Sequence, residues 1–228
     1  MTERTDPRAE TFPLVLAGPS GGGKTTIARR LEAHRGDVRF SVSATTRPPR
    51  VDESNFVDYQ FVDRSEFERM IRAGELLEWA EVHGELYGTP RANLEAARAV
   101  GAHLLLDIDV QGARMVRRLE PACVAVFVLP PSGERIVERL RARGTESEEA
   151  LRRRLAAAEA ELAAIEAFDY LVINDELETA VRAVEQILDA EGRRLARLGT
   201  GARERVRELM QQIERTLLPG ATAKEGAE

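Results

Sequence analysis

The chain has 228 residues, of which 43% are hydrophobic and 32% charged, and its formal net charge is −6. This balance predicts one globular domain with a sizeable core and excludes a largely disordered chain. The negative charge argues against broad nucleic-acid binding, and no apolar run approaches the roughly 18 residues of a membrane span, so we expect neither nucleic acid nor membrane as a partner.

The N-terminal residues and the single cysteine bear on the compartment. Residues 1–11 are polar, lack the apolar segment of a secretory signal, and are expected to form a flexible extension. Cys123 lies in an apolar run and has no second cysteine with which to form an internal disulfide. It is interpreted as a buried small side chain in a reducing compartment, so we expect a cytoplasmic protein.

The first strand and helix are joined by a glycine-rich loop. Residues 13–17 form a short apolar run, and residues 24–31 have a helical pattern. Between them lies the phosphate-loop pattern Gly18-Pro19-Ser20-Gly21-Gly22-Gly23-Lys24-Thr25, followed by Thr26. In such a loop the backbone N–H groups surround phosphate oxygens, Lys24 reaches the β and γ phosphates, and the Thr25 hydroxyl ligates magnesium. The chain has 31 arginines but only two lysines, Lys24 and Lys224, which makes a chance match hard to accept.

Residues 41–90 are predicted to form an inserted, partly antiparallel lobe. They contain β-like pieces over 41–43, 59–62 and 78–82, and a short helix for which Ser65 begins a capping-box pattern. Arg47 and Arg50 are three residues apart among prolines and suit a clamp for a monophosphate, because guanidinium groups pair with phosphate oxygens. Tyr59 and Tyr87 add hydroxyl donors.

The remaining elements alternate between strands and helices. We expect strands over 103–109, 122–129 and 170–173, and helices over 89–100, 145–167 and 177–198. Thr89-Pro90 and Thr145 are the predicted helix starts. The strand over 103–109 ends in Asp107 and Asp109, whose spacing places both on one face, toward the crevice at the carboxyl ends of the strands. The alternation predicts an α/β fold with a parallel sheet flanked by helices.

The arginines of residues 135–154 flank a predicted hinge at Gly144-Thr145, so residues 133–160 are interpreted as a helical lid. Residues 199–228 form a predicted C-terminal helical tail. Its apolar residues Val206, Met210, Ile213 and Leu217 are typical either of a surface helix or of a self-association stripe, and the oligomeric state, monomer or homo-oligomer, stays open.

Several motif blocks follow one another along the chain: the phosphate loop, Ser43-Ala44-Thr45-Thr46-Arg47-Pro48-Pro49-Arg50, Tyr87-Gly88-Thr89, Leu106-Asp107-Ile108-Asp109-Val110-Gln111-Gly112, Arg143-Gly144-Thr145-Glu146 and Val172-Ile173-Asn174-Asp175. In these blocks and their order, residues 13–198 closely resemble the guanylate kinase family. This resemblance implies a P-loop NTPase-type domain over 12–198 that phosphorylates GMP, and by extension dGMP, with ATP and magnesium.

The resemblance also implies roles for individual residues. The acceptor's phosphate would be held by Arg47, Arg50, Tyr59 and Tyr87, and its guanine by Ser43, Glu78, Thr89 and Asp109, with Asp107 in the same site. The lid arginines Arg139, Arg143 and Arg154 would act with Lys24 and Arg47 on the transferring phosphoryl group, and Asn174 would contact the donor base. A carboxylate such as Glu78 suits guanine because it accepts from the ring N–H and the exocyclic amine together.

Two alternatives are weighed against this interpretation. One is a kinase of another phosphorylated acceptor, such as ribose bisphosphate, and the other is a non-catalytic protein-binding module with a guanylate-kinase-like fold. The intact phosphate loop disfavours the second. One departure from the family pattern is residues 51–58, which contain no glycine, so we expect another loop geometry there, affecting Arg50 and Tyr59 more than Arg47 or Glu78.

Overall fold

The computed structural model describes residues 10–217, apart from residues 83, 143–147 and 199. Contacts divide the chain into two compact units, of which one is Thr11–Ile187 and the other contains the described residues from Leu188 onward together with Glu10. All residues that line the candidate site below belong to the first unit. The predicted N-terminal extension lies outside the described residues except for its last two positions.

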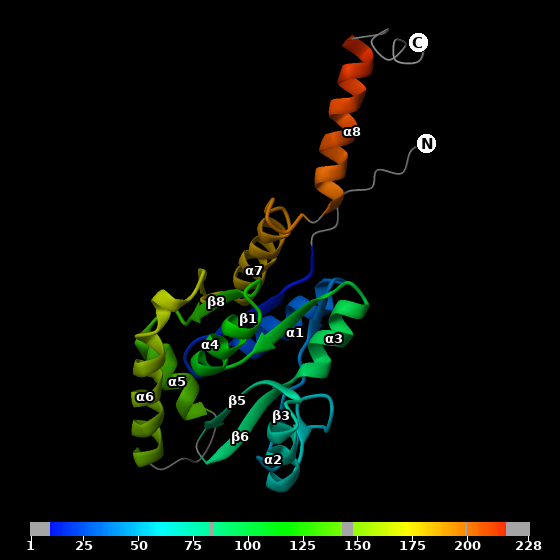
Figure 1. The fold of residues 1–228 in the computed structure, drawn as a ribbon. Coiled ribbons are helices and arrows are strands. Elements are labelled where there is room, and N and C mark those ends of the chain that lie inside the picture. The colour runs from blue at the N-terminus through cyan, green and yellow to red at the C-terminus, as the bar shows by residue number, and fades with distance from the viewer. Residues whose placement is uncertain (1–9, 83, 143–147, 199, 218–228) are drawn as a thin grey trace, which may run out of the picture. The chain divides into compact units, whose positions relative to one another are not determined.

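A five-stranded parallel sheet forms the centre of the first unit, with the strand order β2-β7-β1-β8-β9 (Figure 1). These strands are β1 (Pro13–Ala17), β2 (Val38–Phe40), β7 (His103–Asp107), β8 (Val124–Leu129) and β9 (Tyr170–Ile173). The bounds of β1 and β9 are those that the sequence predicted. Every residue of β1 is buried, as expected where both faces of a parallel sheet are covered.

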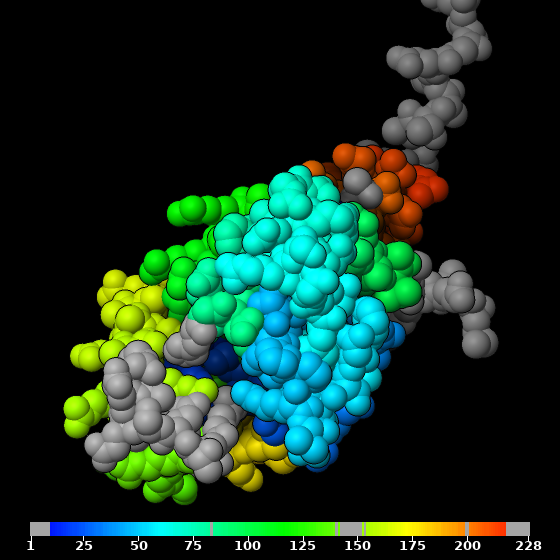
Figure 2. All heavy atoms as spheres, turned by 90° about the horizontal axis from the view of Figure 1, so that it is seen from below, coloured from blue at the N-terminus to red at the C-terminus, as the bar shows by residue number. Residues whose placement is uncertain are grey.

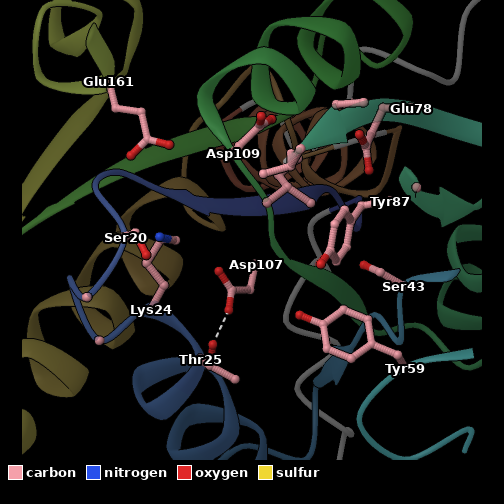
Figure 3. A pocket seen from close by; sticks show the side chains of 16 residues that line it. Ser20, Lys24, Thr25, Ser43, Tyr59, Glu78, Tyr87, Asp107, Asp109 and Glu161 are labelled. Atoms are coloured by element: carbon pink, nitrogen blue, oxygen red, sulfur yellow. Dashed lines mark hydrogen bonds between the residues drawn. The ribbon is translucent and has the colours of Figure 1, made fainter. Parts of the chain in front are cut away.

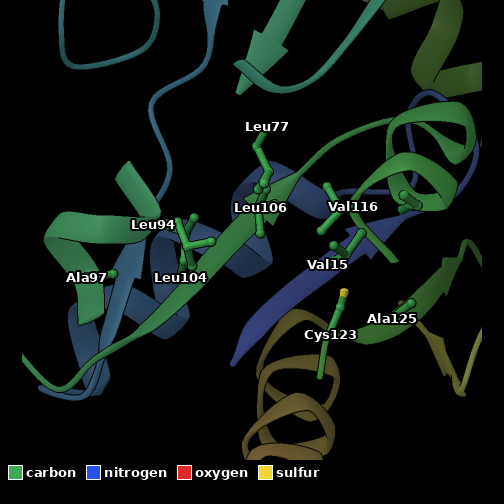
Figure 4. Close-up of a cluster of buried hydrophobic side chains, with 11 residues drawn as sticks. Val15, Leu77, Leu94, Ala97, Leu104, Leu106, Val116, Cys123 and Ala125 are labelled. Carbon is green, nitrogen blue, oxygen red and sulfur yellow. The ribbon is translucent and has the colours of Figure 1, made fainter. Parts of the chain in front are cut away.

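Helices pack on the central strands of this sheet. Helix α1 (Lys24–His34) contacts β1, β2 and β7, α3 (Arg91–Ala99) contacts β7, and α4 (Val110–Leu119) contacts β1 and β8. Alternate residues of β1 and β7, among them Val15 and Leu106, point into one hydrophobic cluster that also holds Cys123 (Figure 4). Burying one such large side chain stabilises the fold by about 1.5–3 kcal/mol. The predicted burial of Cys123 is confirmed.

The inserted lobe is built on a second sheet, with the order β4-β3-β6-β5. Its strands are β3 (Ala44–Thr45), β4 (Gln60–Phe61), β5 (Leu76–Val82) and β6 (Glu85–Pro90). β3 pairs in parallel with β4, whereas β6 pairs antiparallel with both β3 and β5, so the partly antiparallel lobe is confirmed. Phe67 and Met70 of helix α2 (Arg64–Arg72) pack beneath this sheet against Leu76 and Leu86.

The other described helices are α5 (Gly133–Ala142), α6 (Glu148–Leu162), a 3-10 turn at Ile165–Ala167, α7 (Leu177–Glu191) and α8 (Thr200–Leu217). A small cluster around Ile136 and Ala158 joins α5 to α6. Helix α7 ends well before the predicted residue 198, and Gly192 follows its last residue. The apolar residues predicted to form a stripe on α8 are exposed, and both interpretations of that stripe remain predictions.

Two predicted helix caps are wrong, although both helices begin within two residues of the prediction. The N-cap of α2 is Asp63, whose carboxylate accepts from the backbone N–H of Glu66 at 2.8 Å, while the hydroxyl of Ser65 donates to Asp63. Aspartate satisfies this free N–H well, so the helix begins earlier than predicted. Thr89 lies in β6, and its hydroxyl bonds a buried carboxylate instead of capping α3. The cap predicted at Thr145 lies outside the described residues.

Two segment predictions also need correction. Residues 41–43 form no strand but connect β2, which the sequence did not predict, to β3. The strand predicted over 103–109 ends at Asp107, because Asp109 caps the unpredicted helix α4 and accepts from the N–H of Gly112 at 2.7 Å. The pattern of apolar residues does not show where β7 ends and α4 begins, because the only local signal for that boundary is the capping residue Asp109.

Candidate active site

The phosphate loop lies between β1 and α1, and two side chains hold its backbone. Asn174 donates from Nδ2 to the carbonyl oxygen of Gly22 at 2.8 Å, and Arg139 donates from Nη1 to that of Gly21 at 2.9 Å. Gly23 has a φ of 86°, and a Cβ there would lie 2.2 Å from Asn174 Nδ2, so only glycine fits. Both bonds engage carbonyl groups, which orders the loop without using the N–H groups that bind anions.

Lys24 and Thr25 begin α1 at the mouth of this loop. The ammonium group of Lys24 donates to the carbonyl oxygens of Gly18 at 2.8 Å and Pro19 at 3.3 Å. The hydroxyl of Thr25 donates to Asp107 at the end of β7 (Figure 3). A lysine and a helix N-terminus therefore lie together at a glycine-rich loop, which is an arrangement suited to polyphosphate. Thr26 is exposed on the same first turn.

A cavity extends from the phosphate loop to the inserted lobe. The loop contributes Ser20, Gly21, Gly23, Lys24 and Thr25, and the lobe contributes Ser43, Tyr59, Glu78 and Tyr87. Asp107 and Asp109 stand between these two groups (Figure 3). In Figure 2, blue atoms lie at the bottom of a hollow between the cyan lobe and the yellow-green residues of α5 and α6. The fold thus brings the predicted triphosphate site and the predicted acceptor site to one cavity.

Glu78 is the buried carboxylate at the lobe end of the cavity. It is 3% exposed, and Thr89 donates its hydroxyl to Oε1 at 2.7 Å. A Cβ on Gly112 would lie 2.7 Å from Oε2, so this glycine allows α4 to approach the carboxylate closely. Burial, assisted by the negative charge of Asp109, raises the pKa of Glu78 to about 7. Burial therefore disfavours the ionised form of Glu78 in the empty site. A ligand that offers several hydrogen-bond donors would stabilise this ionised form.

The predicted phosphate clamp is only partly assembled around the cavity. The guanidinium carbon of Arg47 lies 5.3 Å from the ring centroid of Tyr59, and the Tyr59 and Tyr87 centroids are 6.0 Å apart. Arg47 itself does not line the cavity, and the side chain of Arg50 is 67% exposed. Hence Arg47 adjoins the two tyrosines, whereas the guanidinium of Arg50 is mostly exposed and its nearest printed partner is Oε1 of Glu53, 3.8 Å from Nη1.

Residue Phe56 in the glycine-free loop has a φ of 61°, in the left-handed region that glycine favours, and its side chain is 66% exposed. Left-handed backbone costs a residue with a Cβ about 1–2 kcal/mol, and glycine adds about 0.5–1 kcal/mol of unfolded-state entropy, so Phe56→Gly should stabilise the protein by about 0.5–1 kcal/mol. Thermal or urea unfolding measures this, with Val57→Gly as the control that should destabilise. A Phe56→Gly protein less stable than the parent would contradict this account.

Glu161 also lines the cavity, although the sequence pattern did not single it out. It projects from α6 toward the phosphate loop (Figure 3), and its Oε2 atom is buried without a hydrogen-bond partner. Burial raises its pKa, while the charge of Lys24 and a hydrogen bond from the backbone of Ser20 act in the opposite direction. It sits in an Ala- and Glu-rich helix with no motif, so only packing reveals its position.

The lid arginines are placed unequally. Arg139 on α5 reaches the phosphate loop as described above, and Arg154 is partly buried on α6. Arg143 lies outside the described residues. Within residues 10–217, outside the gaps stated above, no helix is long and apolar enough to cross a membrane. In the same part of the chain, no group of three or more His, Cys, Asp or Glu side chains could hold a metal ion.

Comparison with known proteins agrees with this geometry. The profile of the guanylate kinase family matches residues 10–191. The chain is 50% identical over 186 residues to the guanylate kinase of Symbiobacterium thermophilum, covering 82% of this chain and 88% of that protein. It is 51% identical over 172 residues to that of Thermosynechococcus vestitus, covering 75% and 90%. The crystal structure of guanylate kinase from Anaplasma phagocytophilum aligns with a TM-score of 0.69 at 34% identity, covering 93% and 97%. The chain therefore belongs to the guanylate kinase family.

Proposed function

We propose that this protein transfers the γ-phosphoryl group of ATP to GMP, yielding ADP and GDP. The observation that carries the proposal is a single cavity with a phosphate loop at one end and the buried carboxylate of Glu78 at the other. A carboxylate accepts from the ring N–H and the exocyclic amine of guanine together, whereas adenine presents a ring acceptor that it repels. Family membership supports both substrates, and such a reaction returns GMP to the guanine nucleotide pool.

The chemistry needs alignment and charge neutralisation more than a side-chain nucleophile. An oxygen of the GMP phosphate forms the new bond to the γ-phosphorus, while the bond between that phosphorus and the oxygen bridging it to ADP breaks. Lys24, Arg47 and the lid arginines Arg139, Arg143 and Arg154 are the proposed sources of positive charge. Closure of the lid would exclude water, which otherwise would accept the phosphoryl group.

Magnesium is the proposed cofactor, and the oxygen donors present fit it. The Thr25 hydroxyl and the Asp107 carboxylate meet beside Lys24, and magnesium prefers such hard oxygen ligands. Because the described residues hold no cluster of three acidic or histidine ligands, most ligands would be ATP phosphates and water. The ion would neutralise charge on the phosphates, and Thr25 would orient it.

We also propose a function for each segment of the chain. Residues 41–90 are proposed to hold the acceptor and residues 133–160 to form the lid of a catalytic domain over 12–198, with the remainder as extensions. In support, every residue that lines the cavity lies in the unit Thr11–Ile187. ATP and GMP are cytoplasmic metabolites and Cys123 is a buried free thiol, so we propose a cytoplasmic location.

The decisive experiment is a coupled ADP-release assay with ATP, magnesium and a panel of GMP, dGMP, AMP, UMP, CMP and ribose 1,5-bisphosphate. We expect turnover with GMP and dGMP and little with the others. Preferred turnover of ribose bisphosphate would support the other kinase activity instead. ATP binding without turnover of any acceptor would support a non-catalytic module and contradict the proposal.

The pH dependence of GMP binding gives an independent test. Burial raises the pKa of Glu78 to about 7 in the empty site, and only the ionised form can accept both guanine donors. The protein should therefore bind GMP tightly above that pKa and lose affinity as the pH falls through it. The Kd for GMP should be about tenfold higher at about pH 6 than at about pH 8. Calorimetry measures this change. A Kd that is constant over this range, or that changes equally in Glu78→Gln, would contradict the role.

A further inference from the structure

A single carboxylate connects the two residues of the phosphate clamp. Oε1 of Glu53 accepts from Nη2 of Arg47 at 2.8 Å, and Oε2 accepts from the backbone N–H of Arg50 at 2.8 Å. The backbone N–H of Glu53 in turn donates to the carbonyl oxygen of Arg50 at 3.1 Å. Each carboxylate oxygen therefore accepts a hydrogen bond from one of the two arginine residues, Nη1 of Arg50 also lies 3.8 Å from Oε1, and the turn between the arginines is closed by its own hydrogen bond.

The pair formed by Arg47 and Glu53 is well shielded from solvent. The two side chains are 16% and 15% exposed, unlike Arg50 at 67%. The hydrogen bond from Arg47 lowers the pKa of Glu53, and the same bond raises the pKa of Arg47, so both stay charged at neutral pH. Shielded, charge-assisted hydrogen bonds of this length are among the stronger ones in proteins.

The rest of the Arg47 side chain is also confined. Its Nη1 donates to the carbonyl oxygen of Pro48 at 2.8 Å, and its guanidinium carbon lies 5.3 Å from the ring centroid of Tyr59 and 5.8 Å from that of Phe61. A guanidinium has five N–H donors, and these bonds use two of them. The orientation of the group is thus set before any ligand arrives.

We propose that Glu53 is a positioning residue for the acceptor, holding the guanidinium of Arg47 and the backbone of Arg50 in the geometry that receives the phosphate of GMP. The inference rests on the proposed function. A long arginine side chain that is free in the empty site must lose rotamer freedom when it binds, and a side chain already held does not. Glu53 also offsets the positive charge of Arg47, so its removal would strengthen binding if charge mattered more than orientation.

Calorimetry on the full chain with GMP and with guanosine separates these effects, because guanosine lacks only the phosphate. Glu53→Gln keeps the size of the side chain but places an amide group against one of two donors. We expect GMP to bind about tenfold more weakly and guanosine to bind as before. In the coupled assay, KM for GMP should rise about tenfold, while kcat and KM for ATP should each change less than about twofold. Glu53→Asp keeps the charge on a shorter side chain. Its Kd and KM for GMP should therefore lie between those of Glu53→Gln and those of the parent protein.

Asp52→Asn is the matched control, since it removes the same charge from the adjacent, exposed position and should leave both affinities unchanged. Equal weakening of GMP and guanosine in Glu53→Gln would show a general structural role and overturn the inference. Tighter GMP binding would show that Glu53 competes with the phosphate, which also overturns it. If the parent protein does not prefer GMP to guanosine, the proposed function itself fails, and this result needs no Glu53 variant.

Discussion

Lys24→Ala should lower kcat by about 10²- to 10³-fold, a loss of about 3–4 kcal/mol by analogy with removal of an oxyanion donor. In the described structure the ammonium group of Lys24 donates to the carbonyl oxygens of Gly18 and Pro19 at the phosphate loop. The proposed ATP site would place the transferring phosphoryl group within reach of this ammonium group, and alanine offers no substitute. The coupled ADP-release assay with saturating ATP and GMP measures the effect.

The chain supplies its own control for this substitution. Lys224 is the only other lysine in the sequence, so Lys224→Ala makes the same chemical change far along the chain and should leave turnover unchanged. Thermal unfolding of both variants separates lost chemistry from lost folding, and a parental melting temperature is expected for each. Near-normal kcat in a folded Lys24→Ala protein would refute the assignment of the phosphate loop.

Glu78→Gln should raise KM for GMP by about 10²-fold, because an amide replaces one of two acceptors with a donor facing the donors of guanine. Thr89 would still donate to the amide oxygen, as it now does to Oε1 at 2.7 Å, so the amide nitrogen would take the position facing the base. KM for ATP should stay within about twofold, since the phosphate loop is untouched. The preference for GMP over AMP should fall together with the affinity.

Steady-state kinetics with GMP and AMP as acceptors test this expectation. Glu81→Gln is a suitable control, because Glu81 lies on the same strand, β5, and is exposed. It should behave like the parent protein for both acceptors. If Glu78→Gln retains the parental ratio of GMP to AMP turnover, Glu78 does not read the base.

Local sequence patterns predicted several parts of the molecule well. The strands Pro13–Ala17 and Tyr170–Ile173 were predicted residue for residue, and the phosphate loop stands between its strand and helix as the motif requires. These features depend on neighbours in the chain, namely short apolar runs with clear ends and glycines that permit a tight turn. Asp107 and Asp109 also line one cavity as expected, although Asp109 does so as the cap of α4 and not as part of a strand.

Contacts between distant segments explain the misses. Thr89 was interpreted as a helix cap, but its hydroxyl bonds Glu78 because β6 pairs with β5. Neither Glu53 nor Glu161 belongs to a recognisable sequence motif. Glu53 contacts Arg47 and Arg50 only because the loop folds back, and Glu161 reaches the cavity only because α6 packs near the phosphate loop.

The amino-acid sequence alone thus determined the phosphate loop, the alternation of strands and helices in an α/β fold, and the β-like segments of the inserted lobe. Each of these features follows from residues that are near one another in the chain. Tertiary structure alone decided that Glu78 is buried with a raised pKa, that Arg47 is held by Glu53, and that Glu161 faces the phosphate loop. Burial and charge pairing depend on which side chains come into contact in the folded protein. Packing between segments that are distant in the sequence decides those contacts.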